Sequence, residues 1–390
     1  MKFRLRIILS IILTLIGSSV IIWLLLRGYF VEKFINPNEL INLDNASKIG
    51  DFIGGFTGAL FTLTGVILLY ETLAFQRREL AESRRVFEKQ QFDNSFFELL
   101  RLYNDIIGKI SFKESRKIYR GRDFFKLYKE KLQEQFRPKK VLSFNRKNAT
   151  ALFEKFYVEH HDSLSVYFRT LYRLYSLIDE SIIKESEKAT YSKILRAQLS
   201  ESELFFLRYN GMTEIGRKSS FFINKYNLLK HLSHFDLLEY KDWWSKLNDF
   251  EKNGIGYIFI ELKSYLQDFI NDPEYSEFSK GFKNNRYVLQ VSSQEYNYFE
   301  ILIIKDDSKS SRKKDMTDGL EKFTNKEIEN LLECLIKDFV ILSNFNAYNE
   351  RKELDFYSDT SISNTKTNIK VGVKNKIGNP LIVKFPHGIA

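Results

Sequence analysis

The amino-acid sequence predicts a mainly α-helical membrane protein. Its first part is expected to form a transmembrane hairpin of two helices, followed by a helical cytosolic domain with a small β element near the C-terminus. Three observations support this class: residues 1–70 contain two uncharged apolar runs, most later segments place apolar residues three and four apart, and the β-rich stretches follow residue 285. The one cysteine, Cys334, excludes an internal disulfide and a zinc site built on several thiolates.

The two apolar runs have the length of membrane spans. Residues 7–26 contain no ionisable side chain and, as a helix, are about 30 Å long, which is the thickness of a bilayer core. A secretory signal would have a shorter apolar region followed by a cleavage site, so we interpret this run as a retained anchor. Residues 52–70 are also uncharged and are bounded by Asp51 and Glu71. Residues 1–70 are therefore predicted to form a membrane hairpin.

Basic residues near the ends of the spans predict that both termini face the cytoplasm. Three of them precede the first span, three lie in the connector of residues 27–49 beside three acidic residues, and five lie in residues 71–90. Lysine and arginine accumulate on the cytoplasmic side of membranes, so the two outer segments are expected on that side.

Small residues recur every four positions in both runs: Gly50, Gly54, Gly58 and Thr62 in the second, and Ser10, Thr14 and Ser18 in the first. Such strips let two helix backbones approach closely. Two interpretations stay open, because the strips can hold the hairpin together or join copies of the chain. Two helices cannot enclose a pore, so any permeability function would need a homo-oligomer.

Residues 71–110 continue the helical pattern of the second span without a breaker. The simplest prediction is one helix that leaves the bilayer and couples the hairpin to the cytosolic domain. The alternative is a solvated linker, because residues 76–91 are rich in charge.

Positive charge is concentrated between Lys109 and Lys147, where fourteen basic residues stand against four acidic ones. This composition predicts a basic patch for the phosphates of anionic lipids or of nucleic acid, and an idle solvated surface is the alternative. The cations of the predicted patch are Arg137, Lys139, Lys140, Arg146 and Lys147. The aromatic residues of the segment fit a helix face better than a base-stacking platform, so we assign them to the core: Phe124, Phe125, Tyr128 and Phe136.

Residues 111–350 are predicted to be mostly helical. Apolar periodicity favours helices over residues 158–178, 188–199, 201–210, 218–240, 243–271 and 324–344. Two of these begin with the Ser/Thr-x-x-Glu pattern of a capping box, at Ser200 and Thr324. Residues 286–291 and 298–304 favour a β-hairpin, and residues 351–390 read as a tail or as two short strands within residues 368–385.

Several strings resemble a known family. They are YFRTLY at residues 167–172 and YSKILRAQLSESELFFLRYN at residues 191–210, preceded by the two spans and by FDNSFFELLRLYNDI at residues 92–106. Together they are similar to the phage abortive infection proteins, the AbiC-like proteins of bacteria, over residues 50–240. The family often has a histidine before YFR, where this chain has Val166, with His160 and His161 earlier. The motif residues are Tyr167, Phe168, Arg169, Tyr172, Arg196, Gln198, Ser200, Glu203 and Asn210.

The resemblance implies a role in defence at the bacterial inner membrane, in which an infected cell stops growing or dies before phage are released. Related two-span effectors are toxic components of retron systems, which makes a reverse transcriptase with its RNA and DNA product a candidate partner.

The motif residues have two chemical interpretations. A buried arginine needs a carboxylate, so Arg169 or Arg196 is expected to pair with Glu203. The alternative is a phosphate or nucleotide site built from the two arginines.

Known catalytic patterns are missing from the sequence. Residues 211–219 miss the phosphate-binding loop by one position, His231-x-x-His234 lacks the usual metal-site spacing, and neither the Arg-to-His spacing of HEPN ribonucleases nor Gly-x-Ser-x-Gly occurs. We therefore expect no catalytic residues, metal or cofactor.

The leading hypothesis is an abortive-infection effector whose spans assemble and damage the lipid bilayer when infection changes the cytosolic domain. The alternative is a membrane-tethered toxin that binds or cleaves nucleic acid through residues 109–147. A third hypothesis is a membrane scaffold for another defence protein.

Overall fold

The computed structural model describes residues 2–30, 43–114, 117–139, 142–271, 277–283, 286–294, 297–309, 316–342, 354–376 and 381. They form two compact units, Met1–Asp93 and Asn94–Ala390. The chain is mainly helical and carries a small β-sheet near its C-terminus, as predicted.

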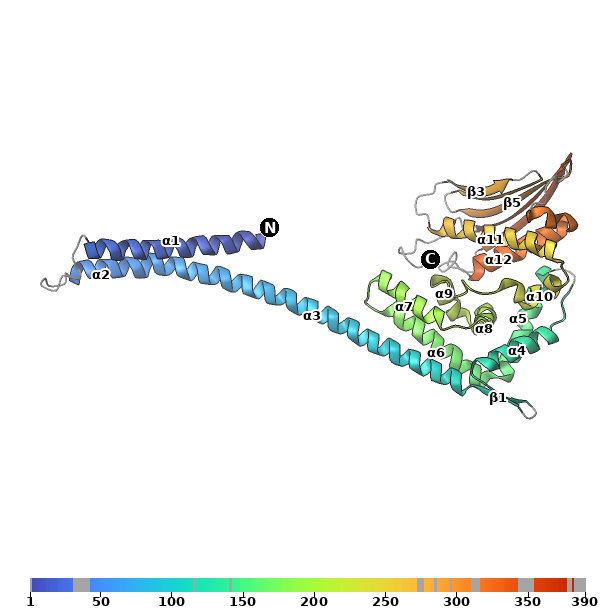
Figure 1. Cartoon of the computed structure of the whole chain (residues 1–390), viewed down its shortest axis with the longest axis horizontal. Helices are drawn as coiled ribbons and strands as arrows, with labels where there is room; N and C mark the ends of the chain where they lie inside the picture. The colour runs from blue at the N-terminus through green and yellow to red at the C-terminus, as the bar shows by residue number, and fades with distance from the viewer. Residues whose placement is uncertain are drawn as a thin grey trace. The chain divides into compact units, whose positions relative to one another are not determined.

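The N-terminal unit is a pair of long helices (Figure 1). The first is α1 (Lys2–Phe30), and the second consists of α2 (Leu43–Phe52), the π-helical turn η1 (Ile53–Thr57) and α3 (Gly58–Lys109). Phe52 and Gly58 on either side of η1 both have right-handed helical backbone angles, so the second rod is continuous. Figure 1 shows α1 lying alongside α2 and the first part of α3.

Small and polar side chains hold the two helices of this unit together. Ser10 of α1 is buried, as are Thr57, Thr64 and Glu71 on the second rod. At one end the Arg6 guanidinium lies 2.8 Å from Oε1 of Glu71 and 5.0 Å from the centre of the Tyr70 ring. The ion pair therefore fastens the start of α1 to α3.

Both helices are long and apolar enough to cross a membrane, over Arg6–Arg27 and within Gly50–Lys109. In each case 11% of the most apolar window is buried inside the structure. A core helix of a soluble protein would be mostly buried. A signal sequence would account for α1 alone. Both predicted runs thus form helices whose apolar side chains face outward.

α3 runs without a break from the second apolar run to Lys109, so the predicted helix over residues 71–110 forms. All side chains from residue 75 to residue 91 are exposed. At 1.5 Å per residue this stretch is about 25 Å long.

The C-terminal unit begins with the last part of α3. A small hairpin follows, β1 (Ser111–Glu114) and β2 (Lys117–Arg120), which the sequence did not indicate. A group of helices follows: α4 (Arg122–Gln135), α5 (Leu142–Glu159), α6 (His161–Glu180), α7 (Glu185–Ala197), α8 (Glu201–Met212) and α9 (Arg217–Lys225). The predicted apolar face of α6 is buried, as are the four aromatic residues of the basic segment that were assigned to the core.

A five-stranded antiparallel sheet with the order β3-β4-β5-β7-β6 completes the unit. Its strands are β3 (Glu277–Lys283), β4 (Tyr287–Gln294), β5 (Tyr298–Asp306), β6 (Leu354–Ser363) and β7 (Lys366–Asn375). Further helices precede the sheet or are interspersed with its strands: η2 (His234–Asp236), α10 (Leu238–Ser245), α11 (Asp249–Asn271), η3 (Met316–Lys322) and α12 (Asn325–Leu342). In Figure 1, α11 and α12 lie against one face of the sheet. The predicted hairpin of residues 286–291 and 298–304 is confirmed as β4 and β5.

Three predicted elements differ from the structure. The helix over residues 218–240 is wrong: α9 ends at Lys225, and Asn227 takes a left-handed conformation with φ of 47° before the chain turns into η2. The helix over residues 243–271 is divided, because α10 ends at Ser245 and α11 begins at Asp249. Residues 366–375 form one strand paired with β5 and β6, and most of residues 377–390 lies outside the described part.

Candidate functional site

The most connected polar group of the motif region is the carboxylate of Glu203, at the start of α8. The backbone N–H of Ser200 donates to its Oε2 at 2.9 Å, and the Glu203 N–H donates to the Ser200 hydroxyl at 3.3 Å. The predicted capping box is therefore confirmed. It holds Glu203 with 0% of its surface exposed.

Three other helices reach the same carboxylate. The hydroxyls of Tyr103 on α3 and Tyr167 on α6 donate to Oε1 at 3.0 and 3.2 Å, and Nε of Arg122 on α4 donates to Oε2 at 3.1 Å. A buried carboxylate is costly unless it is paired, and here its donors come from four helices. We call Tyr103, Arg122, Tyr167, Ser200 and Glu203 the Glu203 cluster.

The two tyrosines of the Glu203 cluster act as hydrogen-bond donors across the physiological pH range. Burial, together with the neighbouring Glu203 carboxylate, raises the pKa of Tyr103 and of Tyr167 well above the usual value for a phenol. The two hydroxyls also lie 3.2 Å apart. Together they tie α3 and α6 to the first turn of α8.

The predicted pairing of Glu203 with Arg169 or Arg196 is wrong. Arg169 donates to the Ser165 carbonyl of its own helix at 3.1 Å, and Arg196 donates to the Asn227 carbonyl at 3.2 Å. The cation beside Glu203 is Arg122, whose other nitrogen Nη2 donates to the Gln198 carbonyl at 2.7 Å. Arg122 precedes Glu203 by 81 residues, and no local pattern links the two positions.

A second buried cluster follows on α8. Arg208 donates to Glu239 of α10 and, at 2.9 Å, to Oδ1 of Asp338 of α12. The hydroxyl of Tyr209 donates to Glu239, and that of Tyr240 donates to Asp338 at 2.8 Å. We call Arg208, Tyr209, Glu239, Tyr240 and Asp338 the Arg208 cluster.

The Arg208 cluster shows why one member of the predicted basic patch is misplaced. Arg146 has a side chain 13% exposed and lies 3.1 Å from Asp338, so it faces inward. Burial would raise the pKa of Asp338, but Arg146 and Arg208 lower it overall. Arg137, Lys139 and Lys147 are exposed, and Lys140 lies outside the described residues.

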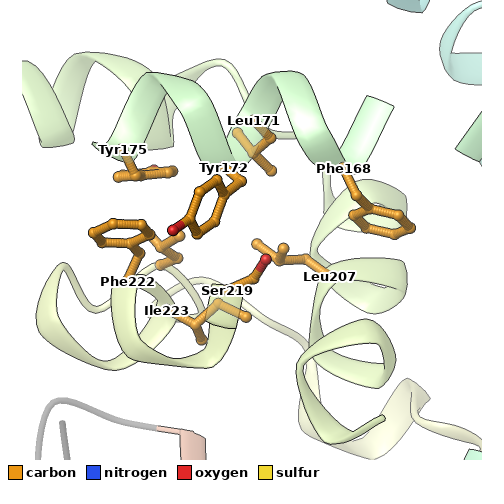
Figure 2. Close-up of a pocket in the computed structure, with 9 residues that line it drawn as sticks. Phe168, Leu171, Tyr172, Tyr175, Leu207, Ser219, Phe222 and Ile223 are labelled. Carbon is orange, nitrogen blue, oxygen red and sulfur yellow. The ribbon is translucent and has the colours of Figure 1, made fainter. Parts of the chain in front are cut away.

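Two other motif residues line a small apolar pocket (Figure 2). Its lining comprises Phe168, Leu171, Tyr172, Tyr175, Leu207, Ser219, Phe222, Ile223 and Leu228. The volume that the centre of a water molecule can reach is about 10 Å³, which is about enough for one water. Neither Arg169 nor Arg196 is among the lining residues, so this pocket does not support a phosphate or nucleotide site.

Asn210 has a structural position at the end of α8. Its carbonyl oxygen accepts a hydrogen bond from the Thr213 hydroxyl at 2.8 Å, and that hydroxyl accepts from the Gly216 N–H at 3.1 Å. A Cβ at position 216 would overlap the Asn210 carbonyl. Gly216 therefore serves a close backbone approach.

The histidines of the region do not form a metal site. His231 lies in the turn after α9 and His234 begins η2, so the two are not on one helix face, and no group of metal-binding side chains occurs within the described residues. Burial lowers the pKa of His234 to about 4, so this ring is neutral at physiological pH. The ring of His160 packs 4.5 Å from that of Tyr128.

The two strips of small residues differ in their surroundings. Ser10 is buried, and Thr14 and Ser18 are half-buried, so this strip lies towards the second helix. Among the described residues, a Cβ added at Gly50 or Gly54 would meet nothing within 4 Å, one added at Gly58 would meet only the Ile53 carbonyl, and Thr62 is exposed. The glycine strip is therefore left free by the hairpin.

Comparison with known proteins places part of each cluster in a family context. Residues 159–236 match the family model described as Putative phage abortive infection protein. No curated protein and no solved structure matches the chain. The matched segment contains α6 to α9, and with them Tyr167, Ser200, Glu203, Arg208 and Tyr209. The resemblance to the AbiC-like phage abortive infection proteins is thus confirmed over residues 159–236.

Proposed function

We propose that the chain is a membrane-anchored effector of abortive infection, in which the two apolar helices cross the bacterial inner membrane and act on it. The observation that carries this proposal is the Tyr103–Glu203 hydrogen bond. It joins the family-matched segment to α3, the same helix that contains most of the second apolar run. A change in the matched segment therefore has a direct route along one continuous helix.

The route begins in the Glu203 cluster. Hydrogen bonds to a charged group contribute more than neutral ones, about 1.5–3 kcal/mol each, and this carboxylate receives them from several helices. A phage-derived ligand or an operon partner that bound α4, α6 or α8 in one state only would shift the position of α3. A reverse transcriptase with its RNA and DNA product is the partner we propose for this regulatory role.

The effector step is proposed to be assembly of the hairpin in the bilayer. The free strip of Gly50, Gly54, Gly58 and Thr62 supports this step, because small residues allow close helix packing in lipid. Assembly of several hairpins would disturb the membrane and depolarise the cell. Protection would then follow from death or arrest of the infected cell.

The test combines a variant of the strip with a matched control. Gly54→Ile with Gly58→Ile should abolish protection and infection-linked depolarisation at unchanged protein level. Ser19→Ile adds similar bulk to an exposed position of α1 and should leave both intact. A membrane-potential dye records the effect. Depolarisation by the double variant at the normal rate would exclude assembly through this strip.

A second candidate function rests on the exposed side chains of Arg137, Lys139 and Lys147. In this case the spans only localise a toxin that binds or cleaves nucleic acid through the basic segment. Replacing the three residues with glutamine should then remove toxicity, and RNA or DNA should break down during infection before the membrane potential falls. Intact nucleic acid at the time of depolarisation would favour the membrane effector.

A further inference from the structure

The side of α3 that faces away from α1 carries a row of exposed residues. The row towards α1 is buried or half-buried and consists of Leu60, Thr64, Ile67, Glu71 and Ala74. Two positions after each of these, which is 200° around a helix, lies an exposed residue. The resulting α3 seam is Ala59, Thr62, Val66, Leu69, Leu73, Gln76, Leu80, Ser83, Phe87 and Gln90, all of them exposed.

The α3 seam has the period of a coiled coil. The spacing between its members alternates between three and four residues, and every second member, seven residues after the previous one, is apolar: Ala59, Val66, Leu73, Leu80 and Phe87. A repeat of 3.5 residues keeps one face of a helix turned towards a partner helix over many turns. The α3 seam is therefore suited to a long parallel contact with another helix.

Two large apolar members of the α3 seam lie too far beyond the apolar run for lipid to cover them. Leu80 and Phe87 are 61% and 66% exposed. They lie beyond Glu71, among Arg77, Arg84 and other charged residues of the stretch 75–91. A water-facing helix with large apolar residues at heptad spacing is typical of a surface that binds another chain.

The charges beside the seam select a parallel second copy. Glu79 and Arg84 flank the seam on opposite sides and are five residues apart. In a parallel pair of helices this spacing brings Glu79 of one copy next to Arg84 of the other. An antiparallel pair would instead bring Arg77 and Arg84 against the arginines of the other helix. Two hairpins anchored in one membrane would also be parallel and at equal depth, so each seam residue would meet its own counterpart.

We propose that two copies of this chain pair in parallel along the α3 seam, from the membrane span to residue 90, before any infection. The proposal rests on the proposed membrane anchoring of the hairpin. It adds what α3, the helix proposed to transmit the signal, contacts before infection: the α3 helix of a second copy. Thr62 belongs both to the α3 seam and to the glycine strip, whereas Gly50, Gly54 and Gly58 lie outside the seam and stay available for larger assemblies.

Single cysteines test the pairing in the full-length protein. Cys334 is 2% exposed, and burial raises the pKa of its thiol to about 12, so it does not compete in mild oxidation. Leu80→Cys and Phe87→Cys place a thiol on the seam, and Arg78→Cys and Arg85→Cys place one on the other side of the same stretch. Each variant is oxidised in membranes from uninfected cells, and disulfide-linked dimer is measured on a non-reducing gel.

The two seam variants should give at least fivefold more dimer than the two control variants. Equal crosslinking at all four positions would indicate random collision and overturn the proposal. Absence of dimer at the seam positions would mean that the chain's own C-terminal unit or another protein covers the seam, and would overturn it as well. Leu80→Glu with Phe87→Glu should also abolish co-purification of two differently tagged copies, whereas Arg85→Glu should not.

Failure of the pairing can be distinguished from failure of the proposed function. If the Gly54→Ile, Gly58→Ile variant still protects cells and the seam still crosslinks, membrane damage through the glycine strip is refuted and the pairing stands. Loss of protection in that variant without seam crosslinks would refute the pairing alone.

Discussion

The hydroxyl of Tyr103 lies 3.0 Å from the buried carboxylate of Glu203, a hundred residues later in the chain. This hydrogen bond links the end of the longest helix to a residue of the family-matched segment. The same carboxylate also accepts from Tyr167 and Arg122, so the C-terminal end of α3 is held by several helices at once.

Removing the Tyr103 hydroxyl should weaken this link. Tyr103→Phe leaves the carboxylate with one donor fewer, and we expect the free energy of unfolding of the detergent-solubilised protein to fall by about 1.5–3 kcal/mol. The variant should fail to protect cells although it is still expressed. Tyr172→Phe removes a hydroxyl at the open apolar pocket and should change stability by less than about 0.5 kcal/mol. Equal effects of the two variants would argue against a special role for Tyr103.

Gly216 and Gly256 should respond in opposite directions to alanine. At position 216 the new methyl group would meet the Asn210 carbonyl, and such overpacking costs about 1–3 kcal/mol. At position 256, within α11, nothing lies within 4 Å, so alanine should stabilise the helix by about 0.5–1 kcal/mol. Thermal unfolding of both variants measures the difference. A stabilising Gly216→Ala would contradict the close approach.

The Arg208 cluster should be sensitive to the loss of one carboxylate. Asp338→Asn leaves Arg208 and Arg146 with a neutral neighbour in a buried position, and breaking such a pair costs about 3–5 kcal/mol. Asp242→Asn breaks an exposed pair with Lys246 and should cost less than about 1 kcal/mol. The melting temperatures of the two variants give the comparison. A small effect at Asp338 would mean that water replaces the lost charge.

Stability should fall in mildly acidic solution because of His234. Its pKa is about 4 in the folded protein and 6.5 in the unfolded chain, so the unfolded state takes up a proton first. The stabilising contribution is complete above pH 6.5 and is lost as the pH falls from 6.5 to 4, with a slope of at most about 1.4 kcal/mol per pH unit. His234→Phe should flatten this part of the stability profile.

Local signals in the sequence predicted much of the fold. The spacing of Leu164, Tyr167, Leu171 and Ile178 predicted the buried face of α6, and Ser200 with Glu203 predicted the start of α8. The apolar runs predicted the two long helices. In each case the relevant residues are neighbours along the chain, so their pattern is visible without the fold.

The partners of the buried charges could not be predicted in the same way. Glu203 meets Tyr103 and Arg122, and Arg208 meets Asp338, over separations of 81 to 130 residues. The pairing of β7 with β5 is similarly distant, and it decides between the tail and the short strands that were both predicted, because residues 366–375 form an inner strand. The helix over residues 218–240 failed because Asn227 adopts a left-handed backbone, which the surrounding apolar pattern does not reveal.

The exposed stretch of α3 between residues 75 and 91 also limits how the chain length can vary. The side chains of this stretch are exposed, yet one extra residue would rotate everything beyond it by 100° about the helix axis. Seven extra residues would change the direction by only about 20°. Rotational phase, more than amino-acid composition, is thus the property of this segment that evolution would have to keep.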